Sequence, residues 1–512
     1  MESGEILVID LFAGPGGLGE GVSSVKDEKG NYPFQIGVSV EKESSAHRTL
    51  TTRAFYRKIS KVKGGLDNYS RYVRGDLSRD EFFGLYPKEA QHAISETLGE
   101  PRALGVDNEL IHLRIRQLLD SHQGPKVLIG GPPCQAYSLA GRSRNAGNKN
   151  YKAENDHRNF LYKEYLKVLT IAEPDIFVME NVRGILSAKI NGTAMFPQIL
   201  EDLRDPSRVE GEGNNRTAKY KIYSLVVAAK DENNPTYDKS SDFLIRSEDY
   251  GVPQARHRVI LLGVRDDINR VPNIIMPLKN IVTAGDVLFD LPPLRSGFSK
   301  KKDTQEDWER QVNINSEQLK KILTARFSSE DIDKLDLKPL LGLQRQSSQL
   351  MGIESKIPSH LYDWYYENHP GCVLNHSTRG HMTSDLLRYA FSAAFTQLSG
   401  GISPKSKDFP AALAPEHENW DSGSYADRFR TQARNKYATT ITSHISKDGH
   451  YFIHYDPKQC RSLTVREAAR LQTFPDNYFF EGNRTQQYVQ VGNAVPPYLA
   501  RQIGEIVMGI LQ

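Results

Sequence analysis

The chain has 512 residues, of which 38% are hydrophobic and 25% are charged. This length and composition are typical of a folded protein of roughly three domains, and they exclude disordered, collagenous and low-complexity proteins. Because 66 lysines and arginines nearly balance 63 aspartates and glutamates, any surface that binds nucleic acid has to be local.

The sequence contains no run near the roughly 18 apolar residues of a membrane helix, and its start lacks the layout of a signal peptide. Its three cysteines, Cys134, Cys372 and Cys460, are too scattered for a disulfide framework and form no CxxC pair. We therefore expect an intracellular, soluble protein without a metal site.

Short β-branched runs alternate with helical patterns over the N-terminal third of the chain, which predicts a mostly parallel α/β sheet. The predicted strands end near Asp10, Val40, Gly75, Gly130, Glu180 and Ala229, and a further strand covers 258–264. Residues 77–123 read as a helical insertion. The rhythm changes near Leu291 to a Pro-rich and then charged stretch, so we expect domain boundaries at 291/292 and 436/437.

A glycine motif directly follows the first predicted strand. Gly14, Gly16 and Gly19 fit G-x-G-x-x-G, and Glu41 stands at the end of the next strand. This layout is typical of a site for an adenosine-containing cofactor, whose ribose hydroxyls a carboxylate can bind. NAD and FAD enzymes share it with methyltransferases, and a turn selected for packing alone is a further alternative.

Three other groups follow strand ends, where open α/β sheets bind ligands. Cys134 comes after KVLIG, and a thiol needs a nearby cation to be a useful nucleophile; a small core residue is the alternative. Glu180 is placed to bind a ring nitrogen or deliver a proton, unless it is a solvated neighbour of a helix cap. Arg256 and Arg258 share one face of a strand and can hold an anion, unless that edge is simply solvated.

In their order, DLFAGPGGLGEG, GGPPCQAYS, MENVRGI, PQARHRVILLG, REAARLQTFPD and QVGNAVPP resemble the 5-cytosine DNA methyltransferase family. The resemblance covers roughly 6–291 and 437–512. It implies a Rossmann-like class I methyltransferase domain built from 1–291 and 437–512, with the C-terminal helix packed beside the first strand. Residues 292–436 would form a smaller, inserted target-recognition domain.

The resemblance also implies a function. The chain would transfer a methyl group from S-adenosylmethionine to C5 of cytosine in a specific duplex DNA sequence, as the modification enzyme of a restriction-modification system. Double-stranded DNA would be its partner, a cognate restriction endonuclease would act on the same site, and the enzyme would be a monomer in the bacterial cytoplasm or nucleoid.

Family roles map onto matching positions. Cys134 would attack C6, Glu180 would bind N3, and Arg258, with Arg256 as second choice, would stabilise the adduct or Glu180. The predicted cofactor contacts are Phe12, Gly14, Gly16, Gly17, Leu18, Glu41, Asp76, Asn493 and Val495. The predicted DNA contacts are Gln135, Ser138, Arg142 and Arg144, in a loop expected to close over DNA, and Arg379 in the insert.

Three other functions remain open at this point. A member of the same family acting on transfer RNA would use the same chemistry, although the large insert favours DNA. A nicotinamide-dependent oxidoreductase would use the glycine motif and Glu41. A catalytically idle relative would bind DNA without methylating it.

Overall fold

The computed structural model describes residues 4–133, 157–190, 192–210, 218–416, 420 and 426–512. Its centre is a seven-stranded sheet in the order β2-β1-β3-β4-β10-β7, with β8 paired to β10. The strands are β1 (Ile6–Leu11), β2 (Phe34–Val40), β3 (Lys126–Gly130), β4 (Ile176–Val182), β7 (Tyr220–Ser224), β8 (Leu244–Arg246) and β10 (His257–Arg265). Of these, β10 runs antiparallel to β4, β7 and β8, and the others share one direction, which confirms the mostly parallel α/β sheet.

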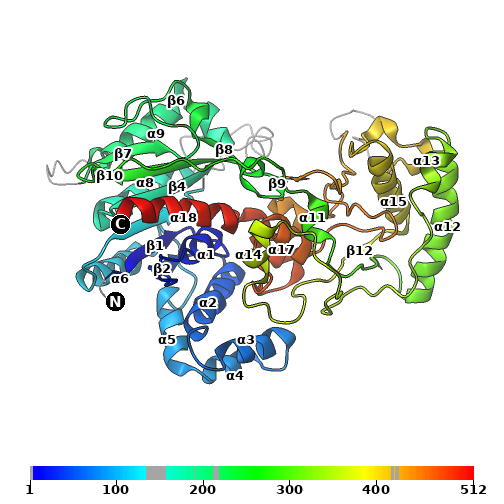
Figure 1. Ribbon diagram of the computed structural model, residues 1–512, viewed down its shortest axis with the longest axis horizontal. Helices are drawn as coiled ribbons and strands as arrows, with labels where there is room; N and C mark the ends of the chain where they lie inside the picture. The colour runs from blue at the N-terminus through cyan, green and yellow to red at the C-terminus, as the bar shows by residue number, and fades with distance from the viewer. Residues whose placement is uncertain (1–3, 134–156, 191, 211–217, 417–419, 421–425) are drawn as a thin grey trace.

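Helices cover both faces of the sheet (Figure 1). On one face lie α1 (Gly17–Ser23) and α18 (Pro497–Leu511), packed against residues such as Val8, Val127 and Ile260. On the other lie α6 (Asn108–Asp120), α8 (His157–Ala172) and α9 (Met195–Arg204). Because successive side chains point to opposite faces, strands buried on both sides need nearly continuous apolar sequences, as β1 and β3 have.

The C-terminal helix completes the sheet domain, as predicted. A Cβ placed on Gly21 of α1 would meet the carbonyl oxygen of Pro497 at 2.2 Å and the Cβ of Ala500 at 2.5 Å. The two helices therefore touch backbone to backbone, and segments from opposite ends of the chain form one packed unit.

One predicted strand is wrong. RYVRG forms the last turn of α3 (Gly65–Arg74), and Gly75 follows it with a φ of 88°. The N–H groups of Gly75 and Asp76 donate to the carbonyls of Tyr72 and Arg71, both at 2.9 Å. A left-handed glycine ends a helix as readily as a glycine turn ends a strand, so the short apolar pattern was ambiguous.

Residues 44–96 form a separate helical group of α2 (Ser44–Ile59), α3, α4 (Arg79–Gly84) and α5 (Pro87–Glu96). Its core is aromatic, with Phe55, Phe82, Phe83, Tyr69 and Tyr72. The prediction that 77–123 is helical is confirmed. However, α6 is not part of an insertion, because it covers the sheet and its buried side chains belong to the core of the sheet domain.

The strand expected to end near Ala229 is shorter. β7 ends at Ser224, whose Oγ accepts hydrogen bonds from the N–H groups of Val226 and Val227, both at 3.1 Å. These bonds turn the chain out of the sheet before the apolar run is complete.

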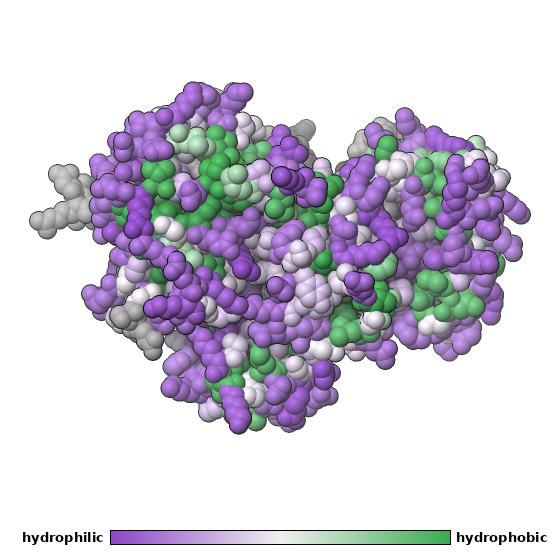
Figure 2. Space-filling view, viewed as in Figure 1, coloured by the Kyte–Doolittle hydropathy of each residue, from purple (hydrophilic) through white to green (hydrophobic). Residues whose placement is uncertain are grey.

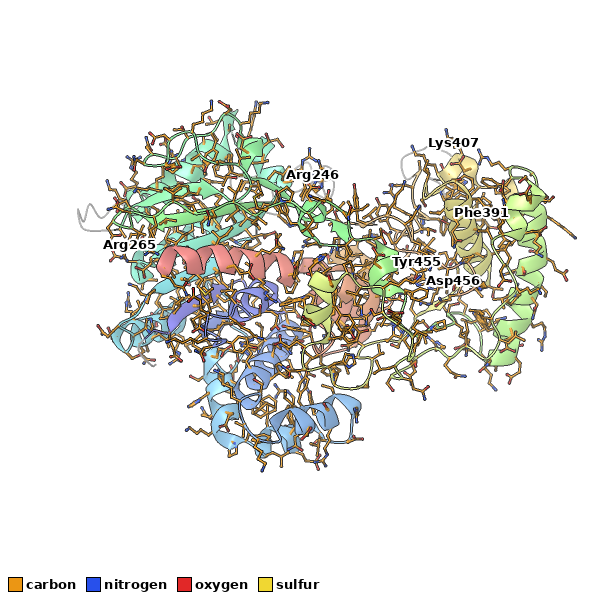
Figure 3. All side chains as sticks on the ribbon, viewed as in Figure 1. Arg246, Arg265, Phe391, Lys407, Tyr455 and Asp456 are labelled. Carbon is orange, nitrogen blue, oxygen red and sulfur yellow. The ribbon has the colours of Figure 1, made fainter. Side chains whose placement is uncertain are left out.

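Most of the insert forms a distal lobe at the far end of the molecule from the sheet (Figure 1). The lobe contains β11 (Gly297–Phe298), α12 (Gln305–Leu323), α13 (Ser329–Asp333), β12 (Gly380–His381) and α15 (Thr383–Leu398). Its core includes Trp308 and Phe391, the latter labelled in Figure 3, and also Ile453 and Cys460 from beyond residue 436. The core of the distal lobe thus draws on both sides of the expected boundary.

A central cluster joins the distal lobe to the sheet domain. It combines α11 (Ala284–Leu288), α14 (Ser359–Tyr366), α16 (Val465–Leu471) and α17 (Arg484–Asn493). Figure 2 shows a largely hydrophilic surface that is indented between the distal lobe and the rest. Within the described residues, no helix combines the length and apolarity needed to cross a bilayer.

Candidate active site

A cavity of about 560 Å³ opens where β1, β2, β3 and β4 end. Parallel strands meet at this edge, which is where α/β sheets bind ligands. The residues that line it at or just after these strand ends include Asp10, Phe12, Gly14, Leu18, Glu41, Gly131, Glu180 and Asn181. Other parts of the chain contribute Arg256, Arg258, Asn493 and Val495. The structure thereby brings together half of the site residues that the sequence singled out.

The turn after β1 is tied directly to Glu41. The N–H of Gly14 donates to Glu41 Oε2 at 2.8 Å, and the N–H of Glu43 donates to Oε1 at 2.6 Å. Phe12 and Gly14 both have positive φ, 55° and 58°, which bends the chain sharply here. Burial raises the pKa of Glu41 despite these hydrogen bonds.

Gly16 and Gly17 lie behind the cavity rather than on its wall. A Cβ on Gly17 would meet the carbonyl oxygen of Val495 at 2.2 Å, and one on Gly16 would meet Leu50 at 2.8 Å. Gly17 therefore allows the turn to pack closely against the returning C-terminal segment, whose Asn493 and Val495 close the cavity, and Gly16 allows it to pack against Leu50 of α2.

Asp10 is a buried carboxyl in the wall that the sequence pattern marks only as a strand end. It is 1% exposed, and neither oxygen has a hydrogen-bond partner within the described residues. Burial raises its pKa to about 8; Arg57 opposes this rise, while Glu41 and Glu96 add to it. A buried acid in this state is neutral over much of the physiological pH range.

Glu180 and Arg258 form an ion pair at the rim. β4 and β10 are antiparallel with Glu180 opposite Ile260, so Arg258 lies one diagonal step away on the same face. Glu180 Oε1 and Arg258 Nε are 2.7 Å apart, and both side chains are about 15% exposed (15% for Arg258, 14% for Glu180). The site therefore holds a carboxylate beside a cation while leaving part of both open to the cavity.

Arg256 is placed differently from Arg258. It is 1% exposed, and its Nη1 donates to the carbonyls of Ile441 at 2.8 Å and Gly492 at 3.2 Å. Burial, with the nearby Arg258 guanidinium, lowers the pKa of Arg256 well below its ordinary value. The guanidinium thus ties together two backbone segments behind the rim.

Two predicted contacts lie away from the cavity. Asp76 is exposed just beyond α3 and is absent from the lining, because RYVRG is a helix end and not a strand end. Arg379 is 8% exposed; it donates to the carbonyls of Lys447 at 2.5 Å and Ile445 at 2.6 Å and lies over the ring of Tyr488. Its Nη1 and Nη2 groups thus bind backbone inside the protein, and its contact with DNA stays a prediction.

Five predicted site residues, Cys134, Gln135, Ser138, Arg142 and Arg144, and the loop expected to close, lie outside the described residues. The segment that leads to them does not: Gly131, Pro132 and Pro133 line the cavity. The carbonyl of Pro132 accepts a hydrogen bond from Asn181 Nδ2 at 3.4 Å, which ties this segment to the end of β4.

Sequence reasoning missed one wall of the cavity. Arg102, Ala103, Leu104 and Val106 precede α6 and line it. The N–H of Arg102 donates to the carbonyl of Glu41 at 2.9 Å, so this loop is fixed to the end of β2. No motif marks these residues; only the fold brings them to the strand ends.

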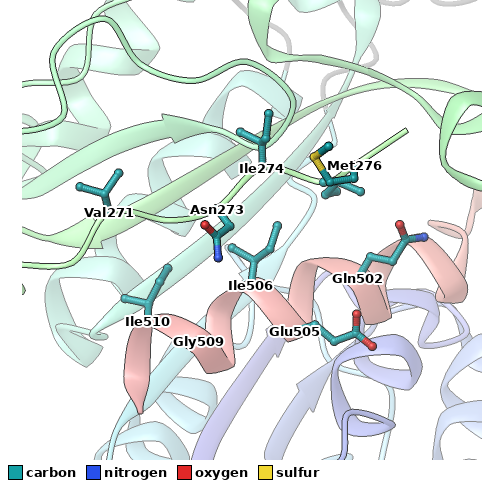
Figure 4. Close-up of a pocket in the computed structure, with 10 residues that line it drawn as sticks. Val271, Asn273, Ile274, Met276, Gln502, Glu505, Ile506, Gly509 and Ile510 are labelled. Atoms are coloured by element: carbon teal, nitrogen blue, oxygen red, sulfur yellow. The ribbon is translucent and has the colours of Figure 1, made fainter. Parts of the chain in front are cut away.

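Another cavity, of about 370 Å³, contains none of the predicted site residues (Figure 4). It lies between residues 271–276 and α18 and is lined mainly by apolar side chains such as Val271, Ile506 and Ile510. In the described part of the chain, no group of three or more His, Cys, Asp or Glu side chains is arranged to hold a metal ion.

Comparison with known proteins gives a consistent result. Residues 106–207 and 218–508 match the model of the C-5 cytosine-specific DNA methylase family. The type II methyltransferase M.Bpa9945I of Bacillus paralicheniformis is 32% identical, over 99% of this chain and 99% of its own. The type II methyltransferase M.AgeI of Thalassovita gelatinovora is 26% identical over 74% of this chain and 82% of its own. The DNA (cytosine-5-)-methyltransferase M.ApeKI of Aeropyrum pernix is 24% identical over 75% of this chain and 81% of its own.

Proposed function

Because the chain belongs to the C-5 cytosine-specific DNA methylase family, we propose that it methylates carbon 5 of cytosine within a specific duplex DNA sequence, with S-adenosylmethionine as donor. The observation that supports this most directly is the Glu180–Arg258 ion pair, 2.7 Å between Oε1 and Nε, in the cavity that also contains Gly14 and Glu41. A cofactor-type turn and an acid beside a cation thus share one cavity.

The wall of the cavity fits the cofactor. Glu41 would bind the ribose hydroxyls, and Phe12, Leu18, Asn493 and Val495 would enclose the remainder, since all line the cavity. The close approach of Gly17 to Val495, which a Cβ would prevent, keeps that wall in place. When bound, S-adenosylmethionine supplies a methyl group on a positively charged sulfur.

The chain's own residues would prepare the cytosine. Carbon 5 is a poor nucleophile while the ring is aromatic, so the Cys134 thiolate would form a bond to C6. Glu180 would donate a hydrogen bond or its proton to N3, which takes up the electron pair that the thiolate pushes into the ring, a step that general acids accelerate by about 10²–10⁴. After C5 has gained the methyl group, loss of its proton would expel the thiolate from C6.

Arg258 would hold Glu180 in position for this step. A carboxyl group has two oxygens, and the ion pair engages Oε1, so Oε2 can face the ring. The target base must leave the duplex to reach the cavity, which costs a few kcal/mol that contacts to phosphate and to the base offset.

A methyl-transfer assay tests the proposal. Labelled methyl groups should enter duplex DNA and not transfer RNA, and 5-fluorocytosine DNA should trap a covalent complex that Cys134→Ser abolishes. Incorporation into RNA alone would favour the RNA alternative, and cofactor binding without a trapped complex would favour an idle relative. Methylation by the serine variant would remove Cys134 as nucleophile.

We further propose that the enzyme is the modification partner of a restriction endonuclease, because two of the relatives described above are named type II methyltransferases. Bisulfite sequencing of DNA from cells that express the protein should show one methylated sequence. That DNA should resist an endonuclease that cuts unmethylated DNA at the same site.

A further inference from the structure

Two glutamines with no exposed surface lie behind the cavity and outside its lining. Gln254 begins β9 (Gln254–Ala255), and Gln472 follows α16; both are 0% exposed. Gln254 Nε2 donates to Gln472 Oε1 at 2.7 Å and to the carbonyl of Leu471 at 2.8 Å. The two side chains therefore form a directly bonded amide pair.

On one side, this pair holds the segment that closes the cavity. Gln472 Nε2 donates to the carbonyls of Val491 at 2.7 Å and Ala494 at 3.2 Å. Between these carbonyls lie Gly492 and Asn493, which line the cavity together with Ala494 and Val495. The glutamine thus bonds the backbone of the wall from behind.

On the other side, the pair holds the strand by which the chain returns from the insert. Gln254 Oε1 accepts the N–H of Ile441 at 2.8 Å. β13 (Ala438–Thr439), just before Ile441, pairs in parallel with β9, and the N–H of Ala438 donates to the carbonyl of Pro253 at 2.9 Å. Ile441 and the wall are thereby linked through two side-chain amides.

We propose that Gln254 and Gln472 are positioning residues that shape the cofactor wall at 491–495 and couple it to the returning strand at 438–441. The proposal rests on the function proposed above, because it takes the occupant of the cavity to be S-adenosylmethionine. The amide of Gln472 is bonded to the buried carbonyl of Ala494, and the amide of Gln254 to the buried N–H of Ile441, so removing either amide leaves a buried backbone group without that partner and the wall has to shift.

Methionine variants test the positioning role, since methionine keeps the length of glutamine and removes its hydrogen bonds. Gln472→Met and Gln254→Met should each weaken binding of S-adenosylhomocysteine, measured by titration calorimetry, about tenfold or more. The kcat at saturating S-adenosylmethionine should change by less than about threefold, since Glu180 and Arg258 are untouched. The double variant should bind more tightly than two independent losses predict, because the residues share a bond.

Gln459→Met is the matched control. Gln459 is also buried and multiply bonded, to Arg461, Asp456 and the N–H of Leu294, but it is not in the cavity wall or the amide pair. It should bind S-adenosylhomocysteine as the wild type does. Unchanged affinity in both amide-pair variants, or an equal loss in Gln459→Met, would overturn the positioning role.

Hydrogen exchange of the unaltered protein tests the coupling. Ala438 is not in the cavity lining, so slower exchange of its N–H on addition of S-adenosylhomocysteine has to be transmitted. We expect this protection in the wild type and its loss in Gln472→Met at saturating ligand. If the wild type binds S-adenosylhomocysteine but Ala438 is not protected, the coupling is overturned and the proposed function is unaffected. If the wild type binds no S-adenosylhomocysteine, the proposed function itself is contradicted.

Discussion

Two arginines that stand two residues apart in the sequence have different surroundings in the fold. Arg258 pairs with Glu180 at the cavity rim, and Arg256 donates to the carbonyls of Ile441 and Gly492. Their spacing predicted a shared face and an anion to hold, but only the antiparallel register of β10 against β4 decides which arginine meets the acid. The spacing of the two residues therefore did not separate them; the family resemblance put Arg258 first, and the register gives the physical reason.

Removing the acid should affect chemistry and spare binding. Glu180→Gln keeps the shape but cannot protonate N3, so kcat should fall about 10²–10⁴ with unchanged affinity for S-adenosylhomocysteine. Arg258→Met should lower kcat less, because the carboxylate remains. Arg265→Met is the control: Arg265 lies at the other end of β10, pairs with Asp175 and Asp267, and is labelled in Figure 3. A comparable loss of kcat in Arg265→Met would show that any charge lost from β10 has this effect.

Asp10 should make the protein less stable as pH rises. Burial raises its pKa in the folded protein to about 8, far above its ordinary value of 3.8, so the folded state binds the proton more tightly. Its contribution is therefore favourable in acid and is lost as pH rises from about 4 to 8. Asp10→Asn should raise the free energy of unfolding relative to wild type on the order of 5 kcal/mol at pH 8, and on the order of 1 kcal/mol at pH 4.5. Denaturant unfolding at both values checks this, and equal effects at both would contradict it.

Elements whose apolar runs are long or bounded by clear turns were predictable from the sequence. β1, β2, β3, β4 and β10 lie where their patterns predict. Gly75 was misread because a helix and a strand can end on the same residue type, and the loop before α6 carries no pattern that predicts its place beside Glu41. Contacts made by irregular segments depend on the finished fold, so sequence periodicity does not report them.

The contact between α1 and α18 should not tolerate one extra methyl group. In Gly21→Ala the new Cβ would lie 2.2 Å from the Pro497 carbonyl oxygen, so the helices must separate, and we expect a loss of about 1–3 kcal/mol in the free energy of unfolding. Gly509→Ala, in α18, would place its methyl group with no neighbouring atom within 4 Å, and it should instead stabilise by up to about 1 kcal/mol. Denaturant unfolding of the two variants checks the pair; equal stabilities would argue against the tight contact.

At the scale of the molecule, buried histidines gather where the distal lobe meets the central cluster. His376 bonds Thr464 and the carbonyl of Pro292, and His381 and His450 share the hydroxyl of Tyr389. The motif NHSTRGH, which contains His376 and His381, does not reveal that these side chains are buried. In the structure their ring nitrogens form hydrogen bonds with buried groups, and these bonds connect the distal lobe to the central cluster.

These histidines should make the junction sensitive to acid. Burial lowers the pKa of His376 and of His454 to about 4, below the ordinary 6.5, so the unfolded chain binds protons that the folded protein excludes. Stability is therefore full above pH 6.5 and falls toward pH 4, on the order of 2 kcal/mol for each histidine at pH 5. His376→Gln should flatten this dependence in thermal unfolding between pH 5 and 7. His92→Gln, at an exposed site on α5, should leave it as steep as in the wild type.

The pairing of α1 with α18 also bears on how the enzyme is made. A ribosome releases the first strand and helix early, yet their apolar face stays uncovered until nearly all of the chain has been synthesised. The nascent chain therefore exposes an apolar, aggregation-prone surface during most of translation. In chaperone-depleted cells, or when the message is translated fast, a larger fraction of this protein should be insoluble than of a control protein of equal size whose N-terminal half folds before its C-terminal half is made.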